Sequence, residues 1–386
     1  MIPYGRQDIS EDDIQAVVEV LRSDYLTQGP VVQVFEKAVA DYCGVQYAIG
    51  VNSATSALHI ACLALGLGKG DIVWTTPITF VASANCVLYC GATVDFVDIN
   101  PRTYNISLDG LEEKLAKAEK VGKLPKILIP VHLCGQACDM AGIYDLSQKY
   151  GFKIIEDASH AIGGKYMGEP IGNCRYSDIA VFSFHPVKII TTGEGGVAVT
   201  NNQALARHMG LLRSHGISNI AADMRPRPSQ EIWNYQQIDL GFNYRLTDIQ
   251  AALGFSQMSR LDSFVEKRHR IADRYDNELD RLPIHIPWQH PDAYSAYHLY
   301  PIRIKSSECN KSQREIYEAM QILGISINLH YIPVYRQPYY EAMGFKAGYC
   351  PEAEQYHLEA LSIPIYSSLT DDEQTKVICA LEAVLI

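Results

Sequence analysis

Residues 126–161, KILIPVHLCGQACDMAGIYDLSQKYGFKIIEDASHA, contain two short apolar segments separated by one helical pattern. The pattern predicts strands over 126–133 and 153–157 and a helix over 139–151. Short apolar strands that alternate with helices are typical of a mostly parallel sheet covered on both faces. This stretch therefore predicts an α/β fold.

The same alternation continues toward the N-terminus of the chain. A helix is expected over 10–23, with Ser10 as its N-cap and Asp13 three residues later. Beyond it, predicted strands and helices take turns: 47–51, 53–65, 71–76, 80–90, 93–99 and 107–119. The parallel sheet is therefore expected to extend over most of the first half of the chain.

The pattern changes after residue 246, where it becomes helical through 279. The proline-bearing stretch 282–291 looks like a boundary region, and a smaller α+β unit is expected beyond it. Its predicted elements are a strand over 298–304, a helix over 313–324, a strand over 326–332 and a helix from Asp371. We divide the chain into a large domain, 1–260, and a small C-terminal domain, 261–386.

The amino-acid composition and net charge exclude some classes of protein function. The chain has 386 residues, 47% of them hydrophobic, which is enough to bury a large core in two domains. A net charge of −11 disfavours a general nucleic-acid binder, although an anionic small molecule still fits a site with local donors. No apolar run is long enough to span a membrane, and MIPYGRQDIS does not resemble a signal peptide, so a cytoplasmic protein is expected.

Ten cysteines are scattered along the chain. Cys86 and Cys90 are four residues apart, as are Cys134 and Cys138, and neither pair has the usual two-residue spacing of a zinc site. We expect reduced cysteines that pack as small apolar groups, and no metal site.

In open α/β sheets, ligands bind at the carboxyl ends of strands, and two predicted strands end in residues of interest. Ser53, Ala54 and Thr55 begin a helix, where free amides and hydroxyls suit a phosphate, although Ser53 could be only an N-cap. Asp157 could cap a turn or pair with a buried cation. His160, three residues later, could be a structural hydrogen-bonding group or a ligand-binding one.

Two further strand ends carry an aromatic residue and a lysine. Phe80 follows a strand and a proline turn, and it could be plain core or a flat face for an aromatic ligand. Ser183 and Lys188 flank a sharp loop, and Lys188 stands between Val187 and Ile189 rather than among other charges. Each of these residues taken alone has an ordinary structural explanation.

Their combination points to one cofactor, pyridoxal phosphate. The cofactor needs a lysine for a Schiff base, a carboxylate for its pyridine nitrogen, a cradle for its phosphate and an aromatic face for its ring. Lys188, Asp157, the helix start at Ser53 and Phe80 would meet these needs. The sequence has no G-x-G-x-x-G and no Walker lysine, so dinucleotide and ATP binding lack support.

With these residues in place, the chain resembles the DegT/DnrJ/EryC1/StrS sugar-nucleotide aminotransferases, which are fold-type I pyridoxal-phosphate enzymes. The resemblance runs essentially end to end. It rests on LTQGP, NSATSAL, TPITFVASAN, VHLCGQ, EDASHA, SFHPVKIITTGEGG, RSHGI, GFNYRLTDIQAALG and HYIPVYRQPYY. It implies a homodimer with composite active sites.

The resemblance also implies residue roles. Lys188 would form the Schiff base and shuttle the proton, Asp157 would pair with the ring nitrogen, and Phe80 would stack on the ring. Phosphate contacts are implied for Ala54, Thr55, Ser183 and, from the neighbouring subunit, Asn243. Nucleotide-sugar contacts are implied for Tyr4, Asp24, Tyr25, Leu26, Thr27, Asn328, Leu329, His330 and Tyr331.

Family members differ at two positions that affect the interpretation of the cofactor site. Many relatives have glutamine where this chain has His160, which puts that contact with the cofactor in doubt but not the chemistry. Some relatives replace the lysine with histidine and become dehydratases, and Lys188 argues against that change here.

The substrate follows from a closer resemblance within the family. PYGRQ near the N-terminus, together with SHA and SFHPVK, resembles the members that serve pseudaminic acid biosynthesis. This implies L-glutamate as amino donor and a UDP-linked 4-keto-6-deoxy sugar as acceptor. A 4-aminotransferase for a perosamine or bacillosamine precursor stays open, as does a cofactor-binding regulatory protein without turnover.

Overall fold

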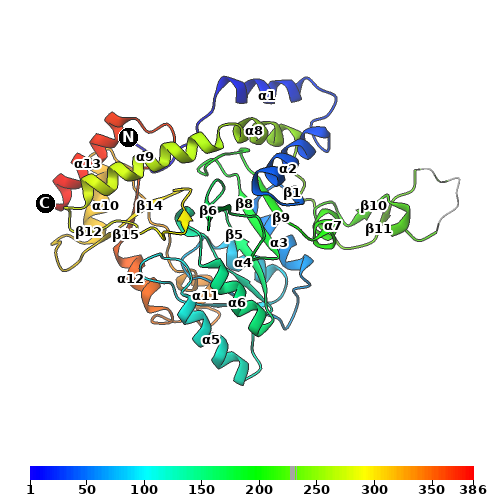
Figure 1. The fold of residues 1–386 in the computed structure, drawn as a ribbon, viewed down its shortest axis with the longest axis horizontal. Coiled ribbons are helices and arrows are strands. Elements are labelled where there is room, and N and C mark those ends of the chain that lie inside the picture. Colours follow the sequence, from blue (N-terminus) through cyan, green and yellow to red (C-terminus); the bar gives the residue numbers. More distant parts are fainter. Residues whose placement is uncertain (227–230, 232) are drawn as a thin grey trace.

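A seven-stranded sheet forms the centre of the computed structural model, which describes residues 1–226, 231 and 233–386 (Figure 1). Across the sheet the strands lie in the order β1 (Tyr47–Val51), β9 (Gly196–Thr200), β8 (Ile179–Ser183), β5 (Lys153–Asp157), β4 (Ile127–Ile129), β2 (Ile72–Thr75) and β3 (Thr93–Phe96). β9 runs antiparallel to both its neighbours, and the other paired strands are parallel. The mostly parallel α/β sheet expected from the sequence is confirmed.

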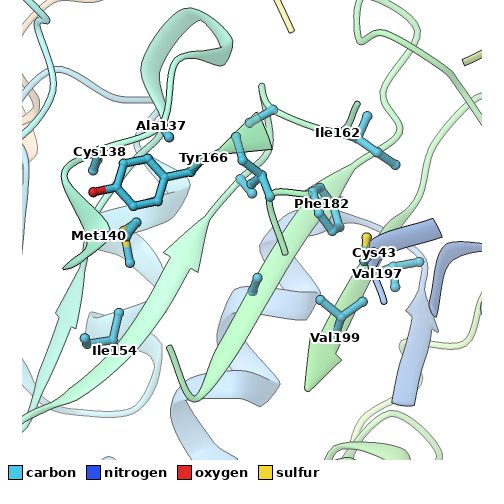
Figure 2. Packing of buried hydrophobic residues seen from close by; sticks show 14 of the residues in the cluster. Cys43, Ala137, Cys138, Met140, Ile154, Ile162, Tyr166, Phe182, Val197 and Val199 are labelled. Carbon is cyan, nitrogen blue, oxygen red and sulfur yellow. The ribbon is translucent and has the colours of Figure 1, made fainter. Parts of the chain in front are cut away.

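Alternate residues of each strand enter two different cores. In β8, Ala180 and Phe182 join one hydrophobic cluster, and Ile179 and Val181 join the other. Figure 2 shows part of the first cluster, where Phe182 and neighbouring strand residues pack beside Cys43. This alternation explains the uninterrupted apolar strands, because a strand buried on both faces has no solvent side.

Helices cover both faces of the sheet. The first cluster receives side chains from α2 (Pro30–Cys43), α5 (Leu108–Lys120), α6 (Met140–Tyr150) and α8 (Asp248–Met258). The second receives side chains from α3 (Ala54–Ala64), α4 (Ala82–Tyr89), α7 (Gln203–Leu212), α11 (Pro338–Glu341) and α12 (Pro351–Glu359). α1 (Glu11–Leu21) packs against α8, and its predicted Ser10–Asp13 capping box is confirmed.

A third cluster gathers the C-terminal elements. It joins Ile2 to side chains of α10 (Gln313–Ile322), α13 (Asp371–Leu385), β12 (Ile284–His285), β14 (Tyr300–Ile304) and β15 (Ala360–Ile363). The long helix α9 (Leu261–Leu279) begins in the first cluster with Phe264 and ends in the third with Tyr275 (Figure 1). We propose the domain division at residue 260 on this basis, with α9 as the element that crosses from one core to the other.

Short elements complete the chain. β6 (Lys165–Tyr166), β7 (Glu169–Pro170) and β13 (Ala293–Tyr294) form a small sheet, and β10 (Ile217–Ser218) pairs with β11 (Gln236–Gln237) at the end of the molecule far from both termini (Figure 1). Three 3-10 turns are η1 (Leu133–Gly135), η2 (Ala221–Asp223) and η3 (Val334–Arg336). Within the described residues, no helix is long and apolar enough to cross a membrane.

Two predicted strands differ from the structure. The segment 326–332 is not a strand, because its only ladder contact is the isolated bridge of Asn328 with Ser362. Residues 328–332 line a cavity instead, and Pro333 has no N–H that could donate to a sheet. The strand predicted over 126–133 stops at Ile129, since Pro130 ends the ladder in the same way.

Candidate active site

A cavity of about 830 Å³ lies at the carboxyl ends of β5 and β8. Its walls come from the start of α3, the turn before α4, the loop after β8 and the segment 328–332. Most of the predicted site residues line it: Tyr4, Ala54, Thr55, Phe80, Asp157, His160, Ser183, Lys188, Asn328, Leu329, His330 and Tyr331. Residues from both ends of the chain therefore meet at one edge of the sheet.

Lys188 projects into this cavity from the loop that follows β8. Burial lowers the pKa of Lys188 to about 8, and the charges of Asp157 and Cys134 oppose that shift. Its Nζ lies 3.5 Å from Nε2 of His298. A lysine in this setting is partly neutral near physiological pH, and only the neutral amine is a nucleophile or a base.

Asp157 is the last residue of β5 and is buried. Its Oδ2 accepts a hydrogen bond from the Ser83 hydroxyl at 2.6 Å, and its Oδ1 accepts from the Ser159 hydroxyl at 2.5 Å and the Ser159 N–H at 3.1 Å. These donors hold the carboxylate in one orientation. A carboxylate has acceptor sites left for a further N–H donor from a ligand.

The start of α3 forms an anion cradle. Ser53 is the N-cap, and its hydroxyl accepts the Ser56 N–H at 3.1 Å, so the capping interpretation of Ser53 is confirmed. The first-turn amides of Ala54 and Thr55 remain free of helix hydrogen bonds and line the cavity. Gly196 packs against this turn so closely that a Cβ there would lie 2.5 Å from the Ala54 nitrogen.

Three histidines surround the lysine. Burial, followed by the Lys188 charge, lowers the pKa of His160, His298 and His330, for His330 to about 3. They are therefore neutral at physiological pH. Nδ1 of His160 accepts the Cys134 N–H at 3.3 Å, so its proton is on Nε2, which donates to Oη of Tyr331 at 3.2 Å.

Phe80 remains 58% exposed although it belongs to the turn before α4. It lines the cavity, and its ring centroid lies 6.4 Å from that of Tyr331. The interpretation of Phe80 as a core residue is therefore wrong, because a core side chain would be covered. An aromatic face left open in a cavity is suited to a flat ligand.

Asn243 and the stretch 24–27 lie outside this cavity and are exposed. The stretch 24–27 contacts the segment that follows Asn243, since Thr27 bridges Thr247 and the Leu26 carbonyl accepts the Asp248 N–H at 3.1 Å. The chain thus brings twelve of the predicted residues together and leaves five on its surface, namely Asp24, Tyr25, Leu26, Thr27 and Asn243.

Sequence reasoning missed three residues of the site. Ser83 and Ser159 lie inside motifs that were singled out, TPITFVASAN and EDASHA, but their pairing with Asp157 depends on the fold. His298 follows Lys188 by 110 residues, and no sequence signal links the two. Among the described residues its buried Nδ1 has no hydrogen-bond partner, which leaves a polar atom available beside the lysine.

These groups fit pyridoxal phosphate. A free helix start suits its phosphate, the Asp157 carboxylate suits a protonated ring nitrogen, and a lysine with a lowered pKa suits its aldehyde. Together with the mostly parallel sheet, this site defines the class of fold-type I aminotransferases.

Comparison with known proteins identifies the family. The sequence profile of the DegT/DnrJ/EryC1/StrS aminotransferase family matches residues 7–382, and the chain belongs to this family. Its members are pyridoxal-phosphate-dependent sugar aminotransferases, so the protein is a transaminase with that cofactor.

Two curated relatives match almost the whole chain. The spore coat polysaccharide biosynthesis protein SpsC of Bacillus subtilis is 36% identical, over 100% of this chain and 97% of its own length. A UDP-4-amino-4,6-dideoxy-N-acetyl-beta-L-altrosamine transaminase of Campylobacter jejuni is 38% identical, over 96% of this chain and 93% of its own length.

Solved structures agree. PseC of Helicobacter pylori, an aminotransferase involved in the biosynthesis of pseudoaminic acid, superposes with a TM-score of 0.90 at 30% identity and covers 100% of this chain and 99% of its own. A putative sugar aminotransferase of Streptococcus pneumoniae in its PMP form has a TM-score of 0.90 at 29% identity, with the same coverage.

Proposed function

We propose that this protein moves an amino group from L-glutamate to C4 of a UDP-linked 4-keto-6-deoxy-N-acetylhexosamine. The acceptor would be UDP-2-acetamido-2,6-dideoxy-β-L-arabino-hexos-4-ulose, and the product UDP-4-amino-4,6-dideoxy-N-acetyl-β-L-altrosamine. The similarity to the Campylobacter jejuni transaminase and to PseC supports this choice of substrate. The observation that carries the chemistry is Lys188, with its lowered pKa, in the same cavity as Asp157.

When bound, pyridoxal phosphate supplies an electron sink for charge that develops at the carbon bearing the amino group. In our proposal Ala54, Thr55 and Ser183 hold its phosphate, Asp157 holds its ring nitrogen protonated, and Phe80 covers one ring face. The Ser83 and Ser159 hydroxyls would hold the Asp157 carboxylate in one orientation. These side chains come from separate elements, so the fold itself assembles the site.

Lys188 would carry the proton. As a neutral amine it would accept the proton released from Cα of the bound glutamate and hold it for return, and it would work in reverse on the sugar. His160, His298 and His330 would help to keep Lys188 uncharged, because they are packed around the amine and exclude the water that would solvate its ammonium form. The two half-reactions would give ping-pong kinetics.

The nucleotide-sugar would enter beside Tyr4 and the segment 328–331. Residues 328–331 belong to the proposed small domain, and the ring of Tyr4 lies 5.2 Å from the ring of His330. A volume of about 830 Å³ falls within the range for pockets that hold a cofactor and a substrate group. The protein would be a homodimer, in which Asn243 and residues 24–27 of one chain complete the site of the other.

One assay tests the proposed substrate. The purified holoenzyme is incubated with glutamate and a panel of UDP-, dTDP- and GDP-linked 4-keto sugars, and amino-sugar formation is followed by mass spectrometry. We expect kcat/KM to be highest for the UDP-linked β-L-arabino 4-keto sugar. Preference for a perosamine or bacillosamine precursor would contradict the proposed substrate. Absence of a spectral change with glutamate would contradict turnover itself.

A further inference from the structure

His298 lies just before β14 and lines the active-site cavity. It is 4% exposed, and its Nε2 lies 3.5 Å from Nζ of Lys188, at the outer limit of hydrogen-bond distance. Among the described residues, no other side chain forms a hydrogen bond with that Nζ. His298 is therefore the side chain that holds the lysine amine through a polar contact.

The backbone at His298 is fixed by Arg268 of α9, which is 1% exposed. The Arg268 Nη1 donates to the carbonyl of Tyr297 at 3.0 Å and to that of His298 at 3.3 Å. It also donates to the Ile365 carbonyl at 3.0 Å. In the described part of the chain Arg268 has no carboxylate partner, and a buried guanidinium without one needs such acceptors. These contacts tie residues 297–298 to α9.

The turn η1 holds the same stretch of backbone. Gly135 has a φ of +102°, and its carbonyl accepts the Ala296 N–H at 3.0 Å. A Cβ on Gly135 would lie 2.8 Å from the Tyr297 nitrogen and 3.1 Å from the His298 nitrogen, so only a glycine allows this close approach. Two elements from distant parts of the chain thus fix the position of the His298 ring.

The ionisable groups that act on His298 are all cations or other histidines: Lys188, His160, Arg268 and His330. Those that act on the lysine include Asp157 and Cys134. Burial first, and then its neighbours, lower the pKa of His298 well below its usual range, so its imidazole is neutral. An ammonium has no lone pair, so Nε2 accepts from a protonated Lys188 and the ring proton is then on Nδ1.

We propose that His298 is a positioning residue that accepts a hydrogen bond from Lys188 while the lysine holds the proton, and that Arg268 fixes His298 for this role. The inference rests on the proposed role of Lys188 as proton carrier. Exclusion of water favours the neutral amine, but it also removes the acceptors that an ammonium needs. Nε2 of His298 replaces one of them and restrains the long lysine side chain, so the proton is returned from a defined position.

Labelling of the amine tests this without turnover. Cofactor-free full-length protein is acetylated briefly across a range of pH, and the modified fraction of Lys188 is measured by mass spectrometry. In His298→Phe the ammonium loses its acceptor, so the labelling midpoint should move to lower pH by about half a pH unit or more. His298→Gln keeps an acceptor and should stay near wild type. An unchanged midpoint in His298→Phe, or equal midpoints in both variants, would overturn the proposal.

The half-reaction of the holoenzyme with glutamate gives the second test. His298→Phe should slow it about tenfold and raise the isotope effect of [2-²H]glutamate, with the bound cofactor unchanged. An unchanged isotope effect would contradict the positioning role. A borohydride adduct on a lysine other than Lys188 would contradict the proposed function instead, and it would leave the labelling result as it is.

A double-mutant cycle tests Arg268. Arg268→Lys keeps the buried charge but loses the fork that spans the carbonyls, so it should slow the glutamate half-reaction about threefold alone. In His298→Phe it should add almost nothing, because the group it positions is gone. Additive losses would show that Arg268 does not act through His298. Gly135→Ala, which displaces the same backbone, takes its place in the cycle if Arg268→Lys does not fold.

Discussion

The residues proposed to bind cofactor and substrate fall into two groups, one buried in the cavity and one exposed on the surface of the chain. Asp157 and Lys188 lie in a cavity where the fold supplies hydrogen-bond donors and removes water. Asn243 and residues 24–27 lie exposed on the outside of the same chain. In our proposal one chain prepares the chemical groups by itself, whereas the outer groups would complete the site of a second chain.

The largest effect should come from the inner group, at Lys188. Lys188→Ala removes the amine that moves the proton, so kcat should fall by about 10⁴-fold, the upper range for general acid–base catalysis. The variant should still retain some cofactor noncovalently. Borohydride reduction of the wild-type holoenzyme followed by mass spectrometry should place the cofactor on Lys188, and an adduct on another lysine would sink the assignment.

Asp157→Asn tests the inner group without changing its size. Loss of a buried charge partner typically costs several kcal/mol, so kcat should drop by roughly a hundredfold or more. Ser159→Ala is a matched control, because it removes hydrogen bonding but leaves the carboxylate, and it should cost about tenfold or less. His160→Gln, the residue of many relatives, should also be mild. Near-normal turnover in Asp157→Asn would show that the carboxylate only caps a turn.

A mixed dimer tests the outer group. Lys188→Ala and Asn243→Ala, each weakly active alone, are combined under conditions where subunits exchange. In a two-fold dimer one site then collects both defects and the other collects neither. Random exchange makes about half of the dimers mixed, so activity should recover to roughly a quarter of wild type. If exchange is demonstrated and no activity returns, Asn243 does not serve the partner's site.

The smallest expected effect is on stability, and it concerns what burial of Lys188 costs. The folded pKa of about 8 is below the unfolded value, so the unfolded chain binds more protons between those two values. The loss of folding stability that results from burying Lys188 is therefore fully present below pH 8, and it decreases as the pH rises toward 10.5. Cofactor-free Lys188→Met should be more stable at pH 7 by roughly 1–3 kcal/mol in urea unfolding, with the gain shrinking by pH 10. A pH-independent difference would contradict this origin.

Much of the fold follows from local patterns. The βαβ alternation predicted the parallel sheet because strands buried on both faces must be apolar throughout. Ser10 and Ser53 were recognisable as N-caps because capping depends on neighbours three residues away. The strand prediction over 326–332 was wrong, since only Ile327 joins the third core cluster and residues 328–332 line the cavity without forming a ladder.

The sequence by itself determined which residue types stand at the strand ends, and through them the cofactor: Asp157, Lys188 and the turn at Ala54 are each encoded locally. Only the tertiary structure decided that Ser83 and Ser159 hold Asp157 and that His298 lies beside Lys188. It also decided that Phe80 stays exposed. The reason is physical: strand ends follow from short-range periodicity, whereas burial, and with it the pKa of Lys188, depends on side chains brought together from distant parts of the chain.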